Sequence, residues 1–392
     1  MIKKLLAYNL EELEKHEILS YAKDLNKSQV ISQVQLDGIK NKVKSNLYSP
    51  SIFMRILLFI LSLIGLSTVL GPVALIMGID SEVGIRVEAF VVGFSILLLL
   101  DFVLIKESKH YKSGVTEAAL VVGLVLFSGG LLGEPNYNPI IYLVYGLAIT
   151  LFAAIRYLNS AGLIAALGFA GAIVFQVLYN FGGLAQALIP FAIMVLYALL
   201  FWGIKKLQSQ KPSFIFDDYF TLSKVFCLLM VYVAGNYFVV RELSVELMGV
   251  NIEPGGDIPF AFLFYFFTGF IPLGYLFYGI KRKSILFIRV ALLTVVLSII
   301  TLKIYFSLGA PIVTITLSGA IMIGLALVLL RYLKEPKYGF TREKLLHDKW
   351  DSSELTAFVV SQSLSGHQVE VNDENSEYGG GSFGGGGAGS EF

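Results

Sequence analysis

Six residues interrupt long apolar stretches of the sequence and are the ones that could do chemistry: Asp101, Glu117, Asn236, Thr268, Pro272 and Lys303. A charged side chain at the centre of a membrane-spanning helix costs about 3 kcal/mol, so residues of this kind often mark functional sites. We treat these six as one candidate intramembrane polar site.

Asp101, in the run LLLLDFVLI, and Glu117 are predicted at matching depths in neighbouring apolar segments. Two adjacent carboxylates could bind a cation or a proton. Alternatively, both approach the lipid headgroups and are neutralised by Lys106 and Lys112. We favour this second interpretation.

The other four residues bear on transport. Asn236 follows Gly235, and an asparagine among small residues is more often a link between helices than a substrate site. Pro272, in TGFIPLG, removes the hydrogen bond that the carbonyl of Thr268 would accept, and transporters build sites from interrupted helices. Proline kinks also occur in membrane helices that transport nothing. Lys303 is predicted near the outer end of its segment.

Motifs of known catalytic or metal sites are absent from the sequence. There is no Walker A, HExxH, GxSxG or CxxC motif, and the four histidines lie outside the apolar segments without ligand-spaced neighbours. The single cysteine, Cys227, excludes an internal disulfide. We therefore expect a non-enzymatic protein with no catalytic residues, no cofactor and no metal.

The composition is that of a membrane protein. Only 15% of the 392 residues are charged and 56% are hydrophobic, whereas soluble domains carry about 25% charged residues. The net charge is +1 and the basic residues form short clusters, so no nucleic-acid partner is expected. Ten segments approach the roughly 20 residues that a spanning helix needs: 52–78, 83–105, 115–133, 140–157, 161–180, 184–204, 221–241, 260–280, 284–306 and 311–332.

These segments must be helices, because lipid offers no partner for backbone polar groups. We predict an all-α polytopic bundle of about ten spans. Only three residues, 158–160, separate the fourth and fifth segments. One helix over both would be about 60 Å long, so a tight helical hairpin is expected there.

The distribution of charge predicts the orientation. All but three of the 30 lysines and arginines lie in or beside alternate connections and the termini, and the intervening connections are acidic or neutral. Positive residues favour the cytoplasmic side. We predict that both termini are cytoplasmic.

Four regions follow from this pattern. Residues 1–51 form a cytoplasmic helical segment, in which Asn9 and Glu12 suggest a capping box and a second short helix runs from Val30 toward Gly38. Residues 52–332 form the transmembrane domain, and 333–378 a cytoplasmic tail with short helices starting near Thr341 and Asp351. The glycine-rich residues 379–392 are predicted to be disordered.

Two features resemble known families. A short helical N-terminal segment, LEELEKHEILSYAKDL, before about ten apolar segments resembles uncharacterised bacterial polytopic membrane-protein families, the domains of unknown function. The final GGGSFGGGGAGSEF resembles the tail of bacterial TPM-domain membrane proteins, although the folded TPM domain has no counterpart here. The resemblance implies a bacterial inner membrane.

Taken together, the sequence predicts an integral inner-membrane protein in the lipid bilayer. We expect a non-enzymatic scaffold that binds protein partners at its cytoplasmic termini. The alternative is a secondary transporter of a small solute or ion, which ten spans and kinked helices permit. Polar residues converging on a water-filled cavity would favour transport, whereas dry packing would favour the scaffold.

Overall fold

The computed structural model describes residues 5–77, 81–132, 138–210, 215–250 and 256–305, with single residues between 316 and 331, and excludes the side chains of 69–77. Over these ranges the regular structure is helical, with one isolated parallel bridge between Tyr48 and His110. Most of the tenth predicted segment lies outside the described residues. So do the tail helices predicted near Thr341 and Asp351 and the glycine-rich tail 379–392.

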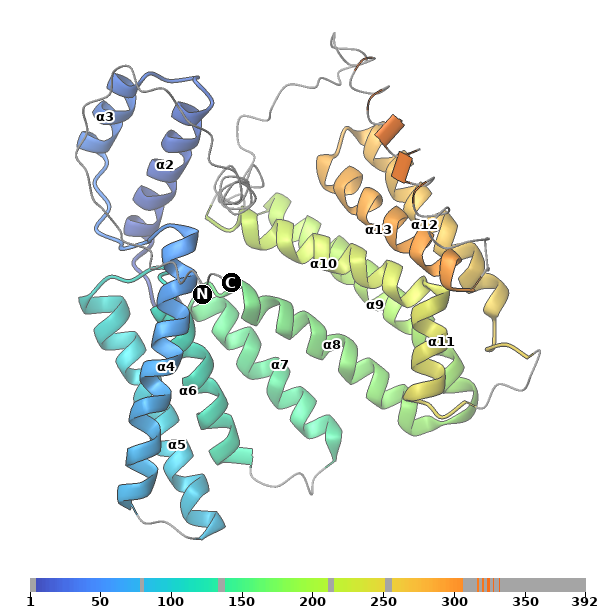
Figure 1. Ribbon diagram of the computed structural model, residues 1–392, viewed down its shortest axis with the longest axis horizontal. Coiled ribbons are helices and arrows are strands. Elements are labelled where there is room, and N and C mark those ends of the chain that lie inside the picture. The colour runs from blue at the N-terminus through green and yellow to red at the C-terminus, as the bar shows by residue number, and fades with distance from the viewer. Residues whose placement is uncertain are drawn as a thin grey trace, which may run out of the picture. The chain divides into compact units, whose positions relative to one another are not determined.

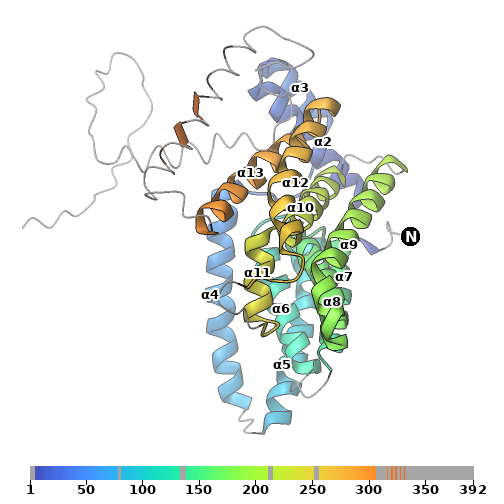
Figure 2. The same ribbon diagram turned by 90° about the vertical axis from the view of Figure 1, so that its right-hand side faces the viewer.

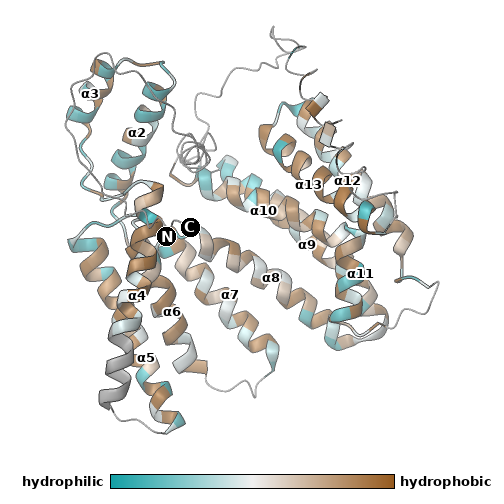
Figure 3. Ribbon diagram, in the orientation of Figure 1, coloured by the Kyte–Doolittle hydropathy of each residue, from teal (hydrophilic) through white to brown (hydrophobic). Residues whose placement is uncertain are grey.

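Among the described residues, eight helices are long and apolar enough to cross a membrane. They confirm the all-helical class and agree with a polytopic membrane protein. In Figure 3 the residues of these helices are mostly hydrophobic (brown), whereas the two N-terminal helices contain more hydrophilic (teal) residues. The spans are Glu82–Glu107 (α5 with η1), Val115–Leu132 (α6), Pro139–Arg156 (α7), Ser160–Phe181 (α8), Ile189–Gln210 (within α9, Gly183–Gln210), Asp217–Gly235 (α10), Ala261–Arg282 (α12) and Ile285–Tyr305 (α13).

The first predicted segment corresponds to α4, Ile52–Met77. Its side chains are described only as far as Thr68, and Ile52–Thr68 forms a shorter apolar helix. The tight hairpin predicted between the fourth and fifth segments is present, and α7 and α8 pack side by side (Figure 1). Asn159 caps α8 by accepting a hydrogen bond from the backbone N–H of Gly162 at 2.6 Å. Leu158 completes the turn with a φ of 49°, a left-handed conformation that is uncommon for leucine.

Two predicted spans differ from the helices observed. The second continues past Leu99 as a π-helix, η1, from Leu100 to Glu107. The seventh, predicted over 221–241, ends at Gly235, where Asn236 adopts an extended conformation. A separate helix, α11 (Tyr237–Glu246), then leaves at an angle to α10 (Figures 1 and 2).

The N-terminal segment contains α2, Leu10–Lys27, and α3, Gln33–Lys42, which pack together (Figure 1). Asn9 caps α2 as expected, but Glu12 does not reach back to it, because its carboxylate accepts a hydrogen bond from the N–H of Asn46 at 2.9 Å. The complete capping box is instead at Ser32 and Gln35. The second helix therefore begins after the position predicted from Val30.

This segment docks onto one end of the membrane helices. The N–H of Ala7 donates to the carbonyl of Arg156 at 2.9 Å, and Tyr48 exchanges backbone hydrogen bonds with the chain at Lys109 and Tyr111. A buried core continues across the junction and includes Tyr8, Leu13, Leu100, Tyr111, Tyr157, Leu158 and Tyr219. We call this the basic end, because Lys106, Lys109, Lys112 and Arg156 lie there, and the opposite end the far end.

Candidate functional site

Asp101 lies in the first turn of η1 and pairs with Arg156, the last residue of α7. The two side chains are 13% and 26% exposed, so most of each charge is removed from water. The second carboxylate oxygen of Asp101 is buried and has no hydrogen-bond partner among the described residues. The carboxylate is therefore neutralised by Arg156, whereas Lys106 lies over the ring of Phe102, 4.3 Å from its centroid.

Arg156 also joins the ion pair to the N-terminal segment. Its guanidinium donates to the carbonyl of Leu5 at 3.4 Å, and its own carbonyl accepts the hydrogen bond from Ala7. The rings of Phe152 and Tyr157 lie 5.9 and 5.7 Å from the guanidinium. The charge of Asp101 thus fixes both α7 and the segment that crosses its end.

Glu117 plays a different part. Its carboxylate accepts hydrogen bonds from the N–H of Gly114 at 2.7 Å and from the hydroxyl of Thr116 at 2.8 Å. Glu117 thereby caps the start of its own helix, α6, where a negative charge is favourable. Asp101 and Glu117 line different cavities, of about 290 and 230 Å³. The two carboxylates are not joined in a shared cation site.

Burial changes the acid–base behaviour of the aromatic residues around this junction. It raises the pKa values of the Tyr8 and Tyr111 hydroxyls well above the usual value, and nearby Glu117 adds to the effect on Tyr8. Burial also lowers the pKa of His110, which is hydrogen-bonded to Ser113 at 3.0 Å. At neutral pH both tyrosines are neutral hydrogen-bond donors.

Asn236 lies at the centre of a second polar cluster, toward the far end. Its amide nitrogen donates to Tyr232 at 2.8 Å and to Thr301 at 2.9 Å. Ser298 accepts from Tyr232 at 2.8 Å and lies 2.6 Å from the carbonyl of Thr268. We call Tyr232, Asn236, Thr268, Ser298 and Thr301 the polar network. All five side chains are buried.

The donors and acceptors of the polar network can be assigned. The Asn236 amide nitrogen can only donate, so the Tyr232 oxygen accepts from it and the Tyr232 hydrogen goes to Ser298. Ser298 then gives its single hydrogen to a carbonyl, and that of Thr268 is the nearer one. No side-chain atom of this network lacks a partner among the described residues. Such a network stabilises one arrangement of the helices.

The network also repairs two backbone defects. Helix α12 continues through Pro272, and Ser298 of α13 supplies the donor that Pro272 denies to the carbonyl of Thr268. The Thr268 hydroxyl accepts the N–H of Tyr237 at 2.9 Å, an otherwise unpartnered group at the start of α11. Thr268 and Pro272 therefore connect α10, α12 and α13 without opening α12.

The structure brings Asn236, Thr268 and Pro272 together but leaves other predicted residues outside. Lys303 is half-buried in the last turn of α13, two positions after Thr301, which places it on another side of that helix. A further amide of the spans, that of Gln176, also lies outside the network and donates to Asn180 at 2.9 Å within α8. A cavity of about 80 Å³ beside α10 and α11 is lined by apolar side chains, including Ile189, Met230 and Val239.

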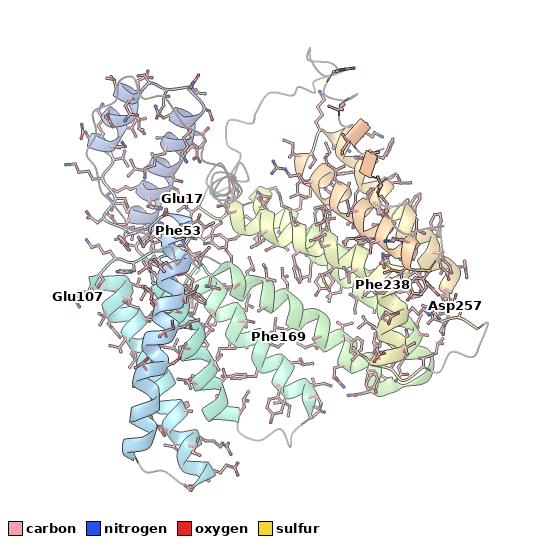
Figure 4. The ribbon with its side chains drawn as sticks, viewed as in Figure 1. Glu17, Phe53, Glu107, Phe169, Phe238 and Asp257 are labelled. Carbon is pink, nitrogen blue, oxygen red and sulfur yellow. The ribbon has the colours of Figure 1, made fainter. Side chains whose placement is uncertain are left out.

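Several residues of these clusters were not predicted from the sequence. Thr294, Ser298 and Thr301 recur at helical spacing on one face of α13, which is a signal that the sequence contains. At the far end, Tyr237 stacks on Tyr265 with ring centroids 4.0 Å apart and donates to Asp257 at 2.8 Å. Figure 4 shows Asp257 near α11. This far-end cluster has no counterpart in the sequence-based expectations.

Within the described part of the chain, no three His, Cys, Asp or Glu side chains form a cluster that could hold a metal ion. Comparison with protein-family models, curated proteins and solved structures found no match to this chain.

Proposed function

We propose that this protein is a non-enzymatic membrane scaffold whose N-terminal helical segment binds a protein partner. The proposal rests on one observation: the N-terminal segment is anchored to the membrane helices on one side and exposes apolar side chains elsewhere. Its inner side joins the buried core of the basic end, while apolar side chains remain exposed on α2, on α3 and in the turn between them. Ile18, Val30 and Val34 are 42%, 51% and 83% exposed. Exposed apolar residues on a fixed support favour an interaction surface.

Secondary transport of a small solute or ion is less well supported. A transport site would be expected where an interrupted helix lines a polar cavity near the middle of the membrane. Helix α10 already has 19 residues, about 28 Å, before it ends at Asn236, so the break follows a full span. The polar groups around that break satisfy one another.

The proposed location is the bacterial inner membrane, with both termini in the cytoplasm. The support is the charge of the basic end, where Lys106, Lys109, Lys112 and Arg156 gather around the docked N-terminal segment. Positive residues favour retention on the cytoplasmic side. A reporter fused at Lys109 should read cytoplasmic, and one fused at Gly256 should read external.

Site-specific photocrosslinking in cells tests the scaffold proposal. A crosslinking residue at Val34 or Val30 should give one discrete adduct of constant mass, and one at the exposed Glu14 should give none. Equal labelling at all three positions, or none at any, would contradict a specific partner surface. Solute flux into proteoliposomes that disappears in an Asn236→Ala variant with an intact fold would support transport instead.

A further inference from the structure

We propose that the 230 Å³ cavity at the basic end binds a phosphate group, through Arg55, Lys112, the Tyr8 hydroxyl and the start of α8. The source is either an anionic phospholipid headgroup or free inorganic phosphate. This site is independent of the proposed partner surface, because its lining does not include Ile18, Val30 or Val34.

Tyr8 gives the first indication of a ligand. Its side chain is only 7% exposed, it lines the cavity, and the described residues offer its hydroxyl no hydrogen bond. A polar group that lines a cavity and has no protein partner is available to bind a ligand there. Because the phenol is neutral, it can donate to an anion.

Arg55 gives the second indication of a ligand. It lies in the first turns of α4, and its Nε is buried without a hydrogen-bond partner among the described residues. Its backbone packs closely against Gly114, whose φ is 89° and where a Cβ would lie 2.1 Å from the Arg55 carbonyl oxygen. An arginine guanidinium beside a cavity can form paired hydrogen bonds with phosphate oxygens.

The start of α8 completes the lining. Asn159 occupies the N–H of Gly162, but the N–H groups of Ser160 and Ala161 have no acceptor in the described chain, and both residues line the cavity. Free N–H groups at a helix start favour an anion.

The charges of the lining also favour an anion. Lys112 adds a second positive charge, and its ammonium lies 5.2 and 5.1 Å from the ring centroids of Tyr111 and Tyr219. The one negative side chain of the lining, Glu117, is engaged in capping α6.

Direct binding to the full-length protein in nanodiscs tests this site. One arm uses phosphatidylcholine nanodiscs and titrates radiolabelled inorganic phosphate. The other arm uses no free phosphate and measures, by native mass spectrometry, phosphatidylglycerol retained from mixed nanodiscs. Saturable binding in the first arm identifies free phosphate as the source, and selective retention in the second identifies a headgroup; either supports the site.

Variants then locate the binding. Arg55→Gln should weaken it about tenfold or more, as expected from losing a charge-assisted hydrogen bond. Tyr8→Phe removes only one oxygen and should also weaken binding, so it serves as the test if Arg55→Gln does not fold. Lys205→Gln removes an exposed charge of α9 outside the cavity and should leave binding unchanged. Absence of binding in both arms, or an equal loss in Lys205→Gln, would overturn the proposal.

Discussion

The basic end and the polar network bury polar groups in opposite ways. In the network, the polar side chains find hydrogen-bond partners among the described residues, and several of these bonds join α10, α12 and α13. At the basic end, Asp101 and Arg55 each keep a buried atom that has no partner among the described residues, and two cavities of about 230 and 290 Å³ adjoin them. A satisfied network fixes helices, whereas unsatisfied groups beside a cavity indicate a place for a ligand.

This difference changes how intramembrane polar residues should be interpreted. Asn236 and Thr268 are the more deeply buried, but their hydrogen bonds are complete within the protein. Arg55 and Tyr8 lie at the end of the helices, yet their lining of a cavity gives them more capacity for binding. Depth in the membrane alone does not identify a functional site.

The largest effect is expected at the ion pair. Arg156→Met leaves the Asp101 carboxylate uncompensated and should lower the free energy of unfolding by about 3 kcal/mol. It should also expose the N-terminal segment to protease, because the contacts to Leu5 and Asp101 are lost together. The double variant Asp101→Asn with Arg156→Met should recover more than half of this loss. Denaturation in micelles would measure the free energy of unfolding of both variants. If the single and double variants lost equal stability, the uncompensated charge of Asp101 would not be the cause.

The next effect concerns the centre of the network. Asn236→Ala leaves Tyr232 and Thr301 without their partner and should cost about 2 kcal/mol. The matched control is Gln176→Ala, which removes another intramembrane amide and should change stability by less than about 0.5 kcal/mol. A loss in Gln176→Ala as large as that in Asn236→Ala would remove the distinction between them.

A smaller effect tests the repair of Pro272 by Ser298. Ser298→Ala should lower the free energy of unfolding by about 1.5 kcal/mol, because it leaves the carbonyl of Thr268 without a hydrogen-bond donor. In a Pro272→Ala background the N–H of residue 272 can satisfy that carbonyl, so the same change should cost about 1 kcal/mol less. Pro272→Ala alone should lie within about 1 kcal/mol of the wild type. Strict additivity in this double-mutant cycle would show that the two residues do not interact.

The smallest effect lies outside the membrane and depends on pH. The Asn46 N–H lowers the pKa of Glu12, so the contact is fully stabilising above the unfolded pKa and is lost as the pH falls through the lower folded value. The amide NMR signal of Asn46 should therefore shift on acidification below about pH 4.3, the ordinary glutamate value. In Glu12→Gln this transition should disappear. Its persistence would assign it to another group.

The sequence predicted the helical class and most helix ranges, because long apolar runs allow few alternatives in lipid. It also indicated Asn236 and Thr268, since a polar residue in such a run needs a partner. The partners themselves depend on how helices pack: Ser298 is 30 residues from Thr268, and Arg156 is 55 from Asp101. The break after Gly235 was missed, because apolar residues resume directly after Asn236, at the start of α11.

The basic end was harder to foresee. Tyr8 and Arg55 lie in different predicted regions, and neither residue type in its local sequence indicates a shared cavity. Their proximity follows from docking of the N-terminal segment, which depends on backbone hydrogen bonds such as that from Ala7 to Arg156. Backbone contacts between distant segments leave little trace in residue types.

The contrast between a dry network and an accessible basic end is tested most directly by cysteine accessibility. In a Cys227→Ser background, Ser298→Cys and Ser160→Cys each place one thiol, the first in the network and the second beside the Tyr8 cavity. A charged, membrane-impermeant thiol reagent should label position 160 readily in inverted or permeabilised membranes and should leave position 298 unmodified. Rapid labelling at 298 that a solute blocks, with the fold intact, would show a water-filled path through the network and contradict its structural role.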